Sequence, residues 1–164
     1  MNAVLESPLP DAQPKTLPRA KKKILLVDDD PATRQLLGLL LTGEGYTVFL
    51  AVNGGESLEA VRAEKIDLVL LDLNMRGMDG WETVEKLASE NPMLPIVMIT
   101  ARPNQRFTAL AAGIGALLEK PVDLPKLFLT IRELLDEPNE IRLARAVGRP
   151  AEFHHVPPRR AAAG

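Results

Sequence analysis

Polar residues with complementary chemistry stand at the ends of the short apolar stretches in the middle of the chain. They are Asp28, Asp29, Asp72, Thr100 and Lys120. The segment "IDLVLLDLNMRGMDGWE" (66–82) shows the pattern clearly, because an apolar run passes directly into the carboxylate of Asp72. If the apolar stretches are parallel strands, their carboxyl ends meet at one edge of a sheet and bring these side chains together.

Electrostatics indicates what such a group of side chains would need. Two unit charges 4 Å apart repel by about 4 kcal/mol at an effective dielectric of about 20, and one lysine offsets only part of the repulsion among three carboxylates. Oxygen ligands favour a hard cation such as Mg²⁺, which commonly works with phosphate groups. With the metal held by Asp28 and Asp29, Asp72 could act as a nucleophile toward phosphorus. Thr100 and Lys120 could then bind the phosphoryl oxygens.

The elements that must position these residues alternate along residues 24–137. Five stretches have the length and composition of buried strands. They are "ILLV" (24–27), "TVFLAV" (47–52), "LVLL" (68–71), "IVMIT" (96–100) and "ALLE" (116–119). Between and after them lie segments with helical spacing, and Asp30 and Asp123 are expected to cap the helices that follow "ILLV" and "ALLE". Five strands alternating with five helices predict a doubly wound α/β fold with a parallel sheet.

Composition and charge divide the chain into three parts. Residues 1–23 and 138–164 each carry five Lys/Arg and two acids, so each end is +3 and residues 24–137 carry −2 − 6 = −8. The Pro-rich residues 1–21 are expected to form a disordered leader, and 138–164 a flexible, solvated basic tail with a short helix possible within 139–149. In this tail we expect His154 and His155 to be incidental residues. There is no cysteine, which excludes disulfides and thiolate chemistry.

Four segments together resemble the receiver domains of two-component response regulators. They are "ILLVDDD", "VLLDLNMRGMDGWE", "IVMITA" and "LLEKPV", and the resemblance covers about residues 22–136. It implies a flavodoxin-like (CheY-like) sheet of five parallel strands in the order 2-1-3-4-5 with five flanking helices. It also implies phosphorylation on aspartate by a histidine kinase or a histidine phosphotransfer protein.

The resemblance assigns a role to each site residue. Asp72 corresponds to the phosphoacceptor, Thr100 to the switch hydroxyl and Lys120 to the phosphate-binding lysine. The implied magnesium ligands are Asp28, Asp29, Asp72 and the main-chain carbonyl of Asn74. The Lys120–Pro121 bond is expected to be cis, and Gly77 and Gly80 to form a tight loop beside the site.

Two positions depart from the family pattern. Arg76 stands where proline is common. Leu117 stands where many receivers have an aromatic residue that turns inward when the switch hydroxyl moves, and leucine cannot reproduce that ring movement.

Several predictions concern the context of the site. We expect a cytoplasmic, stand-alone receiver without a DNA-binding domain, since only 27 residues follow Glu137, and no membrane span, since no apolar stretch approaches about 18 residues. It would signal to an unknown protein target through its fourth helix, fifth strand and fifth helix, with a phosphorylation-dependent homodimer possible. Two alternatives stay open. One is a phosphatase of the haloacid dehalogenase type, although Asn74 stands where such enzymes need a second acid. The other is a receiver-like module that is not phosphorylated.

Overall fold

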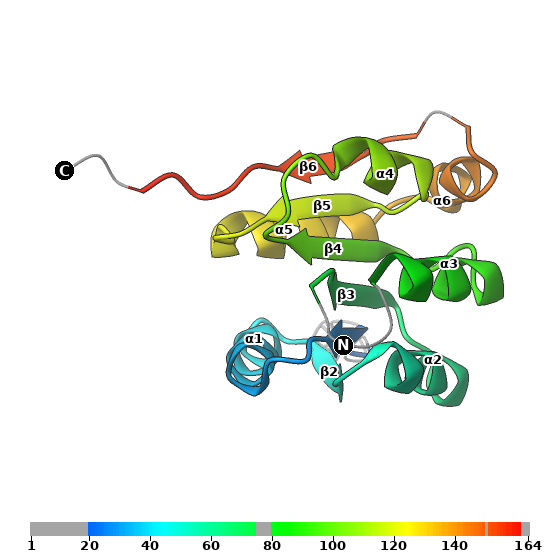
Figure 1. Cartoon of the computed structure of the whole chain (residues 1–164). Coiled ribbons are helices and arrows are strands. Elements are labelled where there is room, and N and C mark those ends of the chain that lie inside the picture. Colours follow the sequence, from blue (N-terminus) through cyan, green and yellow to red (C-terminus); the bar gives the residue numbers. More distant parts are fainter. Residues whose placement is uncertain (1–19, 75–79, 150, 162–164) are drawn as a thin grey trace, which may run out of the picture.

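A parallel six-stranded sheet forms the centre of the computed structural model, which describes residues 20–74, 80–149 and 151–161. The strands follow one another in space as β2-β1-β3-β4-β5-β6, and all adjacent pairs are parallel (Figure 1). Their bounds are β1 Lys23–Val27, β2 Thr47–Ala51, β3 Leu68–Asp72, β4 Ile96–Thr100, β5 Ala116–Glu119 and β6 His154–Val156. The predicted order 2-1-3-4-5 is confirmed, and β6 extends it.

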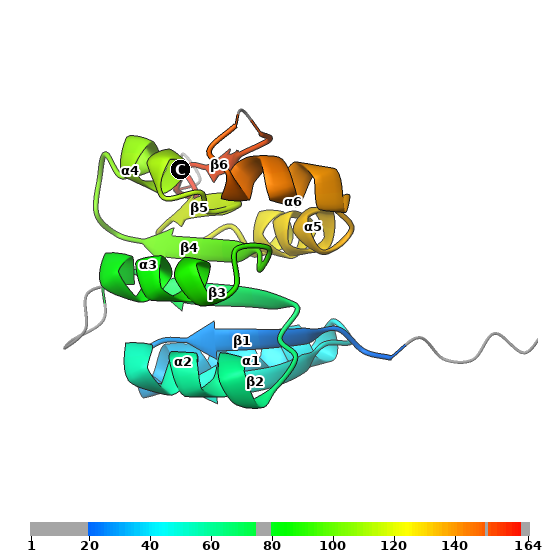
Figure 2. The same ribbon diagram turned by 90° about the vertical axis from the view of Figure 1, so that its right-hand side faces the viewer.

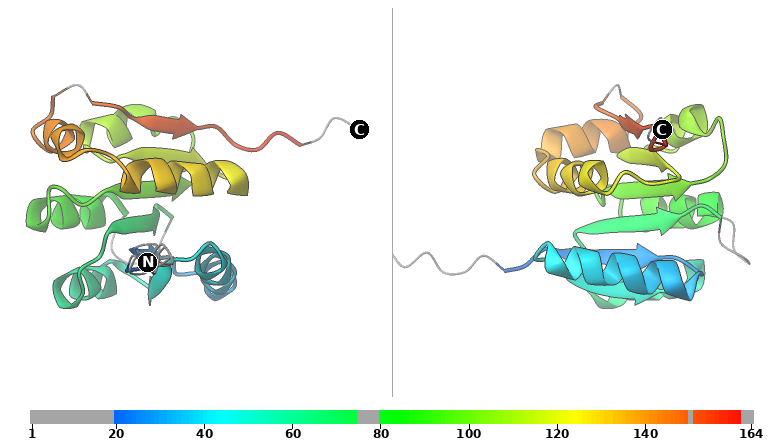
Figure 3. Two further views of the ribbon diagram at one scale, coloured as in Figure 1. Left: turned by 180° about the vertical axis from the view of Figure 1, so that it is seen from behind. Right: turned by 90° about the vertical axis from the view of Figure 1, so that its left-hand side faces the viewer.

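Helices cover both faces of this sheet. Their bounds are α1 Pro31–Gly43, α2 Gly54–Ala63, α3 Gly80–Glu90, α4 Arg106–Ala111, α5 Leu124–Leu135 and α6 Asn139–Ala146. Figure 2 looks onto the face covered by α2, α3 and α4, and the right-hand view of Figure 3 looks onto the face covered by α1 and α5. No helix in the described ranges is both long enough and apolar enough to span a membrane.

The core consists of two aliphatic clusters, one on each face of the sheet. Every residue of β3 and β4 is buried, because these central strands have neighbours on both sides and helices on both faces. The expected helix caps are present. The Asp30 carboxylate accepts a hydrogen bond from the Thr33 amide at 3.0 Å, and the Asp123 carboxylate accepts one from the Lys126 amide at 3.2 Å. The two caps fix where α1 and α5 begin beside the carboxyl ends of β1 and β5.

The structure differs from the sequence interpretation after Glu137. The short helix expected within 139–149 is present as α6, but β6 was not predicted. A solvated tail is therefore wrong for residues 154–156, which pair with β5. The backbone amide of His154 donates to the carbonyl of Gly115 at 3.1 Å. Residues 1–19 of the expected leader (1–21), the Arg76 departure and the Gly77 turn lie outside the described residues.

Candidate functional site

The ends of β3 and β4 and the residues that directly follow β1 and β5 bring the predicted residues to one edge of the sheet. Asp72 ends β3 and pairs with Ile99, while Thr100 ends β4 and pairs with Glu119. The Lys120 amide continues this ladder by donating to the Thr100 carbonyl at 2.8 Å. Asp28 follows β1 directly, and its amide donates to the Ala51 carbonyl at 3.1 Å. Main-chain pairing therefore holds all four residues at the same end of the sheet.

Asp72 and Lys120 form the central ion pair of this edge. The Lys120 ammonium donates to Asp72 Oδ2 at 2.8 Å, and the Asn74 amide donates to Asp72 Oδ1 at 2.9 Å. The Asp72 side chain is 8% exposed and that of Lys120 is 33% exposed. The carboxylate is thus nearly withdrawn from water, with both oxygens engaged. The Lys120–Pro121 bond is cis, as predicted.

Asp28 lies in the same electrostatic environment. Its side chain is buried, and burial raises the pKa of its carboxyl, with Asp72 and Asp29 raising it further by repulsion. A hydrogen bond from the Asp30 amide at 2.9 Å and the charge of Lys120 act in the opposite direction on this pKa. Burial is the largest cause of the raised pKa, and repulsion from Asp72 and Asp29 outweighs the attraction of Lys120, so the charged form of Asp28 is disfavoured. An added cation would stabilise that form.

The donor atoms fit a magnesium ion. Asp28, Asp29 and Asp72 supply carboxylate oxygens that influence one another electrostatically, and the side-chain oxygen of Asn74 is buried without a hydrogen-bond donor in the described part of the chain. Within residues 20–74, 80–149 and 151–161 no group of three or more Asp, Glu, His or Cys side chains is arranged so that it could hold a metal ion by itself. Mg²⁺ does not require such a group, because it keeps several waters and uses one or two carboxylates together with phosphate oxygens.

Thr100 is fully buried, and its hydroxyl is held by the segment that follows it. Thr100 Oγ1 accepts a hydrogen bond from the Arg102 amide at 2.9 Å. A hydroxyl can accept this bond and donate its own hydrogen at the same time, so Thr100 remains able to donate to a group bound at Asp72. The bond connects the position of the hydroxyl to the main chain between β4 and α4.

Gly80 allows α3 to start close to the end of β3. A Cβ atom there would lie 2.8 Å from Leu73 Cδ1 and 2.9 Å from Leu73 Cα. Because Leu73 follows Asp72, a larger residue at position 80 would push on the backbone that positions the carboxylate. The expected close approach is thus present at Gly80.

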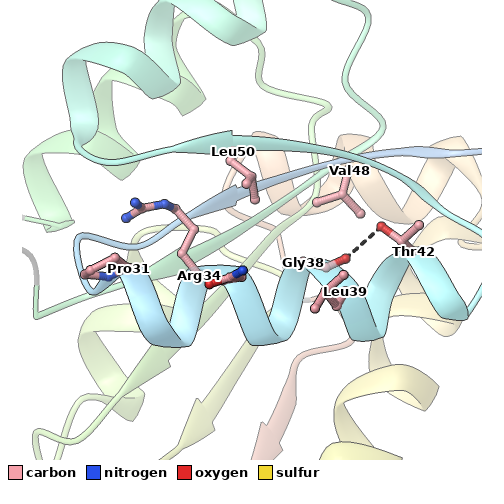
Figure 4. A pocket seen from close by; sticks show the side chains of 8 residues that line it. Pro31, Arg34, Gly38, Leu39, Thr42, Val48 and Leu50 are labelled. Carbon is pink, nitrogen blue, oxygen red and sulfur yellow. Dashed lines mark hydrogen bonds between the residues drawn. The ribbon is translucent and has the colours of Figure 1, made fainter.

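An open groove of about 450 Å³ lies on another part of the surface, between α1 and β2 (Figure 4). Leu39, Val48 and Leu50 line it, with Arg34 at one end. Arg34 Nη1 donates to the Asp28 carbonyl at 2.7 Å, which connects the groove to the backbone of the site. The carboxylates themselves do not line it, so the groove is separate from the candidate chemistry.

The sequence interpretation missed the side chains that β6 brings to the edge of β5. His155 Nε2 lies 3.6 Å from a carboxylate oxygen of Glu119, and His154 Nδ1 lies 3.4 Å from one of Glu133. Phe153 packs against the cluster that contains Leu117. The only local signal was the short stretch "EFHHV" before Pro157, which is too short to identify a strand.

Comparisons with known proteins agree with this geometry. The family model for the response regulator receiver domain matches residues 24–132. Among curated relatives, the transcriptional regulatory protein GlrR of Escherichia coli is 40% identical over 116 residues, which are 70% of this chain and 26% of GlrR. The response regulator MprA of Mycobacterium ulcerans is 41% identical over 115 residues, 69% of this chain and 50% of MprA. The chain thus spans from about a quarter to half the length of these relatives.

Solved structures share the fold and much of the sequence. A CheY-like receiver domain protein from Methanospirillum hungatei is 36% identical with a TM-score of 0.68, over 74% of this chain and 98% of that one. The response regulator TrrA from Thermotoga maritima, solved in complex with Mg²⁺–BeF, is 31% identical with a TM-score of 0.64, over 69% and 98% of the two chains. The sequence match, the parallel sheet and the residues at its edge lead to one assignment: the chain belongs to the response regulator receiver domain family.

Proposed function

We propose that the protein accepts a phosphoryl group on Asp72 from a histidine kinase or a histidine phosphotransfer protein, in a reaction that requires Mg²⁺. The observation that carries this proposal is the buried Asp72 carboxylate, 2.8 Å from the Lys120 ammonium and electrostatically coupled to Asp28. The presence of Mg²⁺–BeF in the related TrrA structure supports it. Membership in the receiver family favours it over the phosphatase alternative.

The proposed reaction uses the groups at the edge of the sheet. One carboxylate oxygen of Asp72 forms a bond to phosphorus, while the bond between phosphorus and the donor's leaving atom breaks and its electron pair stays with the donor. Lys120, which donates to Asp72 Oδ2 before the reaction, can then donate to a phosphoryl oxygen. When bound by Asp28, Asp29, Asp72 and the main-chain carbonyl of Asn74, Mg²⁺ would supply positive charge to offset the phosphoryl oxygens.

The buried Thr100 hydroxyl can report the new group to the rest of the domain. While its oxygen accepts from the Arg102 amide, its hydrogen can be donated to a phosphoryl oxygen, and a shift of Thr100 toward that oxygen would pull on the Arg102 main chain. The added group carries about −1.5 to −2 charges, enough to bias a segment with two arrangements. The segment that leads into α4 is the part that this shift would displace. We therefore propose that phosphorylation changes the surface formed by α4, β5 and α5, through which a protein target or a second copy would be contacted.

Intact mass measurement tests this function. The protein is incubated with Mg²⁺ and a small phosphodonor, alongside Asp72→Asn and the control Glu85→Gln, whose residue is exposed on α3. We expect the wild type and the control to gain one phosphoryl group, and Asp72→Asn and a sample with EDTA to gain none. A wild-type protein without the mass gain, or an equal gain in Asp72→Asn, would contradict the proposal.

A further inference from the structure

The edge of β5 is covered by the chain's own C-terminal strap, which we define as residues 151–161. Within it β6 pairs with β5 in parallel, with Ala116 opposite His154 and Leu118 opposite Val156. Figure 1 shows the strap running beside β5 at the side of the sheet opposite to β2. Without the strap, β5 would present unpaired main-chain groups there, as edge strands do. The strap therefore occupies part of the surface proposed above for signalling.

Both faces of the strap contribute to the core. Phe153 packs against the cluster on the face of α2, α3 and α4, and Val156 packs against the cluster on the face of α1 and α5. Phe153 thus packs on the same cluster as Leu117, the position that is aromatic in many receivers.

Helix α6 fixes the start of the strap to the end of α5. The Arg145 guanidinium pairs with the Glu137 carboxylate, and their side chains are 9% and 6% exposed. The same guanidinium donates to the Glu152 carbonyl at 2.9 Å, just before Phe153. Arg142 Nη2 donates to the carbonyls of Leu134 and Leu135, both at 3.0 Å. These contacts fasten α6 to the domain and leave the strap beyond it held mainly by β5.

The far end of the strap is bound next to the phosphorylation site. The Arg159 amide donates to the Pro121 carbonyl at 2.9 Å, one residue after Lys120. Between these points His155 faces Glu119, which pairs with Thr100 in the sheet. Movement of Lys120 would therefore displace the adjacent Pro121, which the Arg159 amide binds. Movement of Thr100 would displace its sheet partner Glu119, which faces His155.

Phe153 also shares a cavity with α4, the helix that follows the Thr100–Arg102 segment. A cavity of about 400 Å³ separates α4 from the strap, and Leu110, Ala111 and Phe153 are among the residues that line it. Helix α4 has six residues, and Gln105 at its start makes no side-chain cap hydrogen bond. If the Thr100 hydroxyl is drawn toward a phosphoryl oxygen, the Arg102 main chain bonded to it is drawn along, and the wall of this cavity formed by α4 would move relative to Phe153.

We propose that the C-terminal strap covers the edge of β5 in the unphosphorylated protein, and that a phosphoryl group on Asp72 releases it. The strap shares a cavity with α4 and is hydrogen-bonded to the residue after Lys120, and β6 itself has only three residues. Release uncovers β5 between α4 and α5. The inference rests on the proposed function, since the trigger is the phosphorylation of Asp72.

Hydrogen exchange of individual amides tests the release in the full-length protein. The reporters are the amides of His154 and Arg159, which donate to the Gly115 and Pro121 carbonyls. The controls are the amides of Thr47 and Asp67, which donate to the Lys22 and Lys23 carbonyls beside β1, β2 and β3, far from β6 in the strand order. On phosphorylation, verified by intact mass, we expect exchange at the two reporters to accelerate about tenfold or more and the controls to stay unchanged.

A reciprocal experiment uses a matched pair of phenylalanines. If phosphorylation releases the strap, loosening the strap must favour phosphorylation, because coupling between two equilibria is reciprocal. We expect Phe153→Ala to raise the fraction phosphorylated at a limiting concentration of phosphodonor several-fold. Phe107→Ala is the control, since Phe107 on α4 is 83% exposed, and should behave as wild type.

The outcomes separate the two proposals. A protein that gains the phosphoryl mass while the His154 and Arg159 amides remain as protected as before would overturn the strap inference and leave the proposed function intact. Equal phosphorylation of Phe153→Ala and wild type would overturn it as well. A protein that gains no mass would overturn the proposed function and the strap inference together.

Discussion

Replacing Lys120 with methionine removes the ammonium group that holds the Asp72 carboxylate at 2.8 Å and keeps an apolar chain of similar length. Asp72 and Asp28 are then left buried near one another without this positive charge. Breaking a buried ion pair typically costs about 3–5 kcal/mol. Because the Lys120 side chain is 33% exposed, water screens part of the interaction, and we expect a loss of about 2–3 kcal/mol in the free energy of unfolding.

Urea unfolding at pH 7 in EDTA measures this loss. Trp81, the sole tryptophan, packs against the core and donates through Nε1 to Gln105 at 3.2 Å, so its fluorescence should report unfolding. Lys86→Met is the matched control. Lys86 pairs with Glu82 at 3.0 Å on α3, but the two side chains are 47% and 52% exposed, and such a helix pair contributes only about 0.3–0.5 kcal/mol.

A second substitution checks that the effect belongs to the pair. In the double variant Lys120→Met, Asp72→Asn, residue 72 no longer carries a buried negative charge without its lysine, so most of the stability should return. The coupling energy between positions 120 and 72 should be about 2 kcal/mol. If Lys120→Met is no more destabilised than Lys86→Met, or if Asp72→Asn restores nothing, the reasoning about a shared buried charge cluster is refuted.

Two further predictions concern the same edge of the sheet. Gly80→Ala should destabilise the protein by about 1–3 kcal/mol through overpacking and slow phosphorylation, since its Cβ would lie 2.8–2.9 Å from Leu73. The control Gly43→Ala, whose Cβ would have nothing within 4 Å, should do neither. Equal urea midpoints for the two variants would contradict this prediction. The pKa of Asp28 is raised above its usual 3.8, so the folded state binds that proton more tightly and metal-free stability falls as pH rises through this pKa. Asp28→Asn should therefore have a higher Tm than wild type at pH 7 in EDTA, a difference that shrinks below about pH 4, and a smaller rise in Tm with Mg²⁺; a lower Tm in EDTA would contradict the sign.

The sequence was informative about the site because its residues stand at the ends of apolar strands. Asp72 and Thr100 end β3 and β4, and Lys120 follows β5, so the rule that parallel strands gather their carboxyl ends was sufficient to group them. The caps at Asp30 and Asp123 could be predicted for a similar reason, since capping is a local interaction.

The strap could not be predicted in this way. Its three-residue strand has no periodic pattern and is stabilised by pairing with β5, by Phe153 and Val156 in two separate clusters and by Arg145 on α6. All of these depend on contacts between segments distant in sequence or on the turn after α6. Similarly, the direction of the Thr100 hydroxyl depends on the main chain at Arg102, which composition does not specify.

Chemical trapping of the phosphorylated residue tests the central claim most directly. An aspartyl phosphate is reduced by borohydride to homoserine, whereas phosphoserine, phosphothreonine and phosphohistidine are not, so peptide mapping after reduction identifies the acceptor. After incubation with Mg²⁺ and a small phosphodonor, we predict homoserine at position 72 alone, and none without Mg²⁺. Homoserine at Asp28 or Asp29, or a phosphorylated protein that yields no homoserine, would contradict the account.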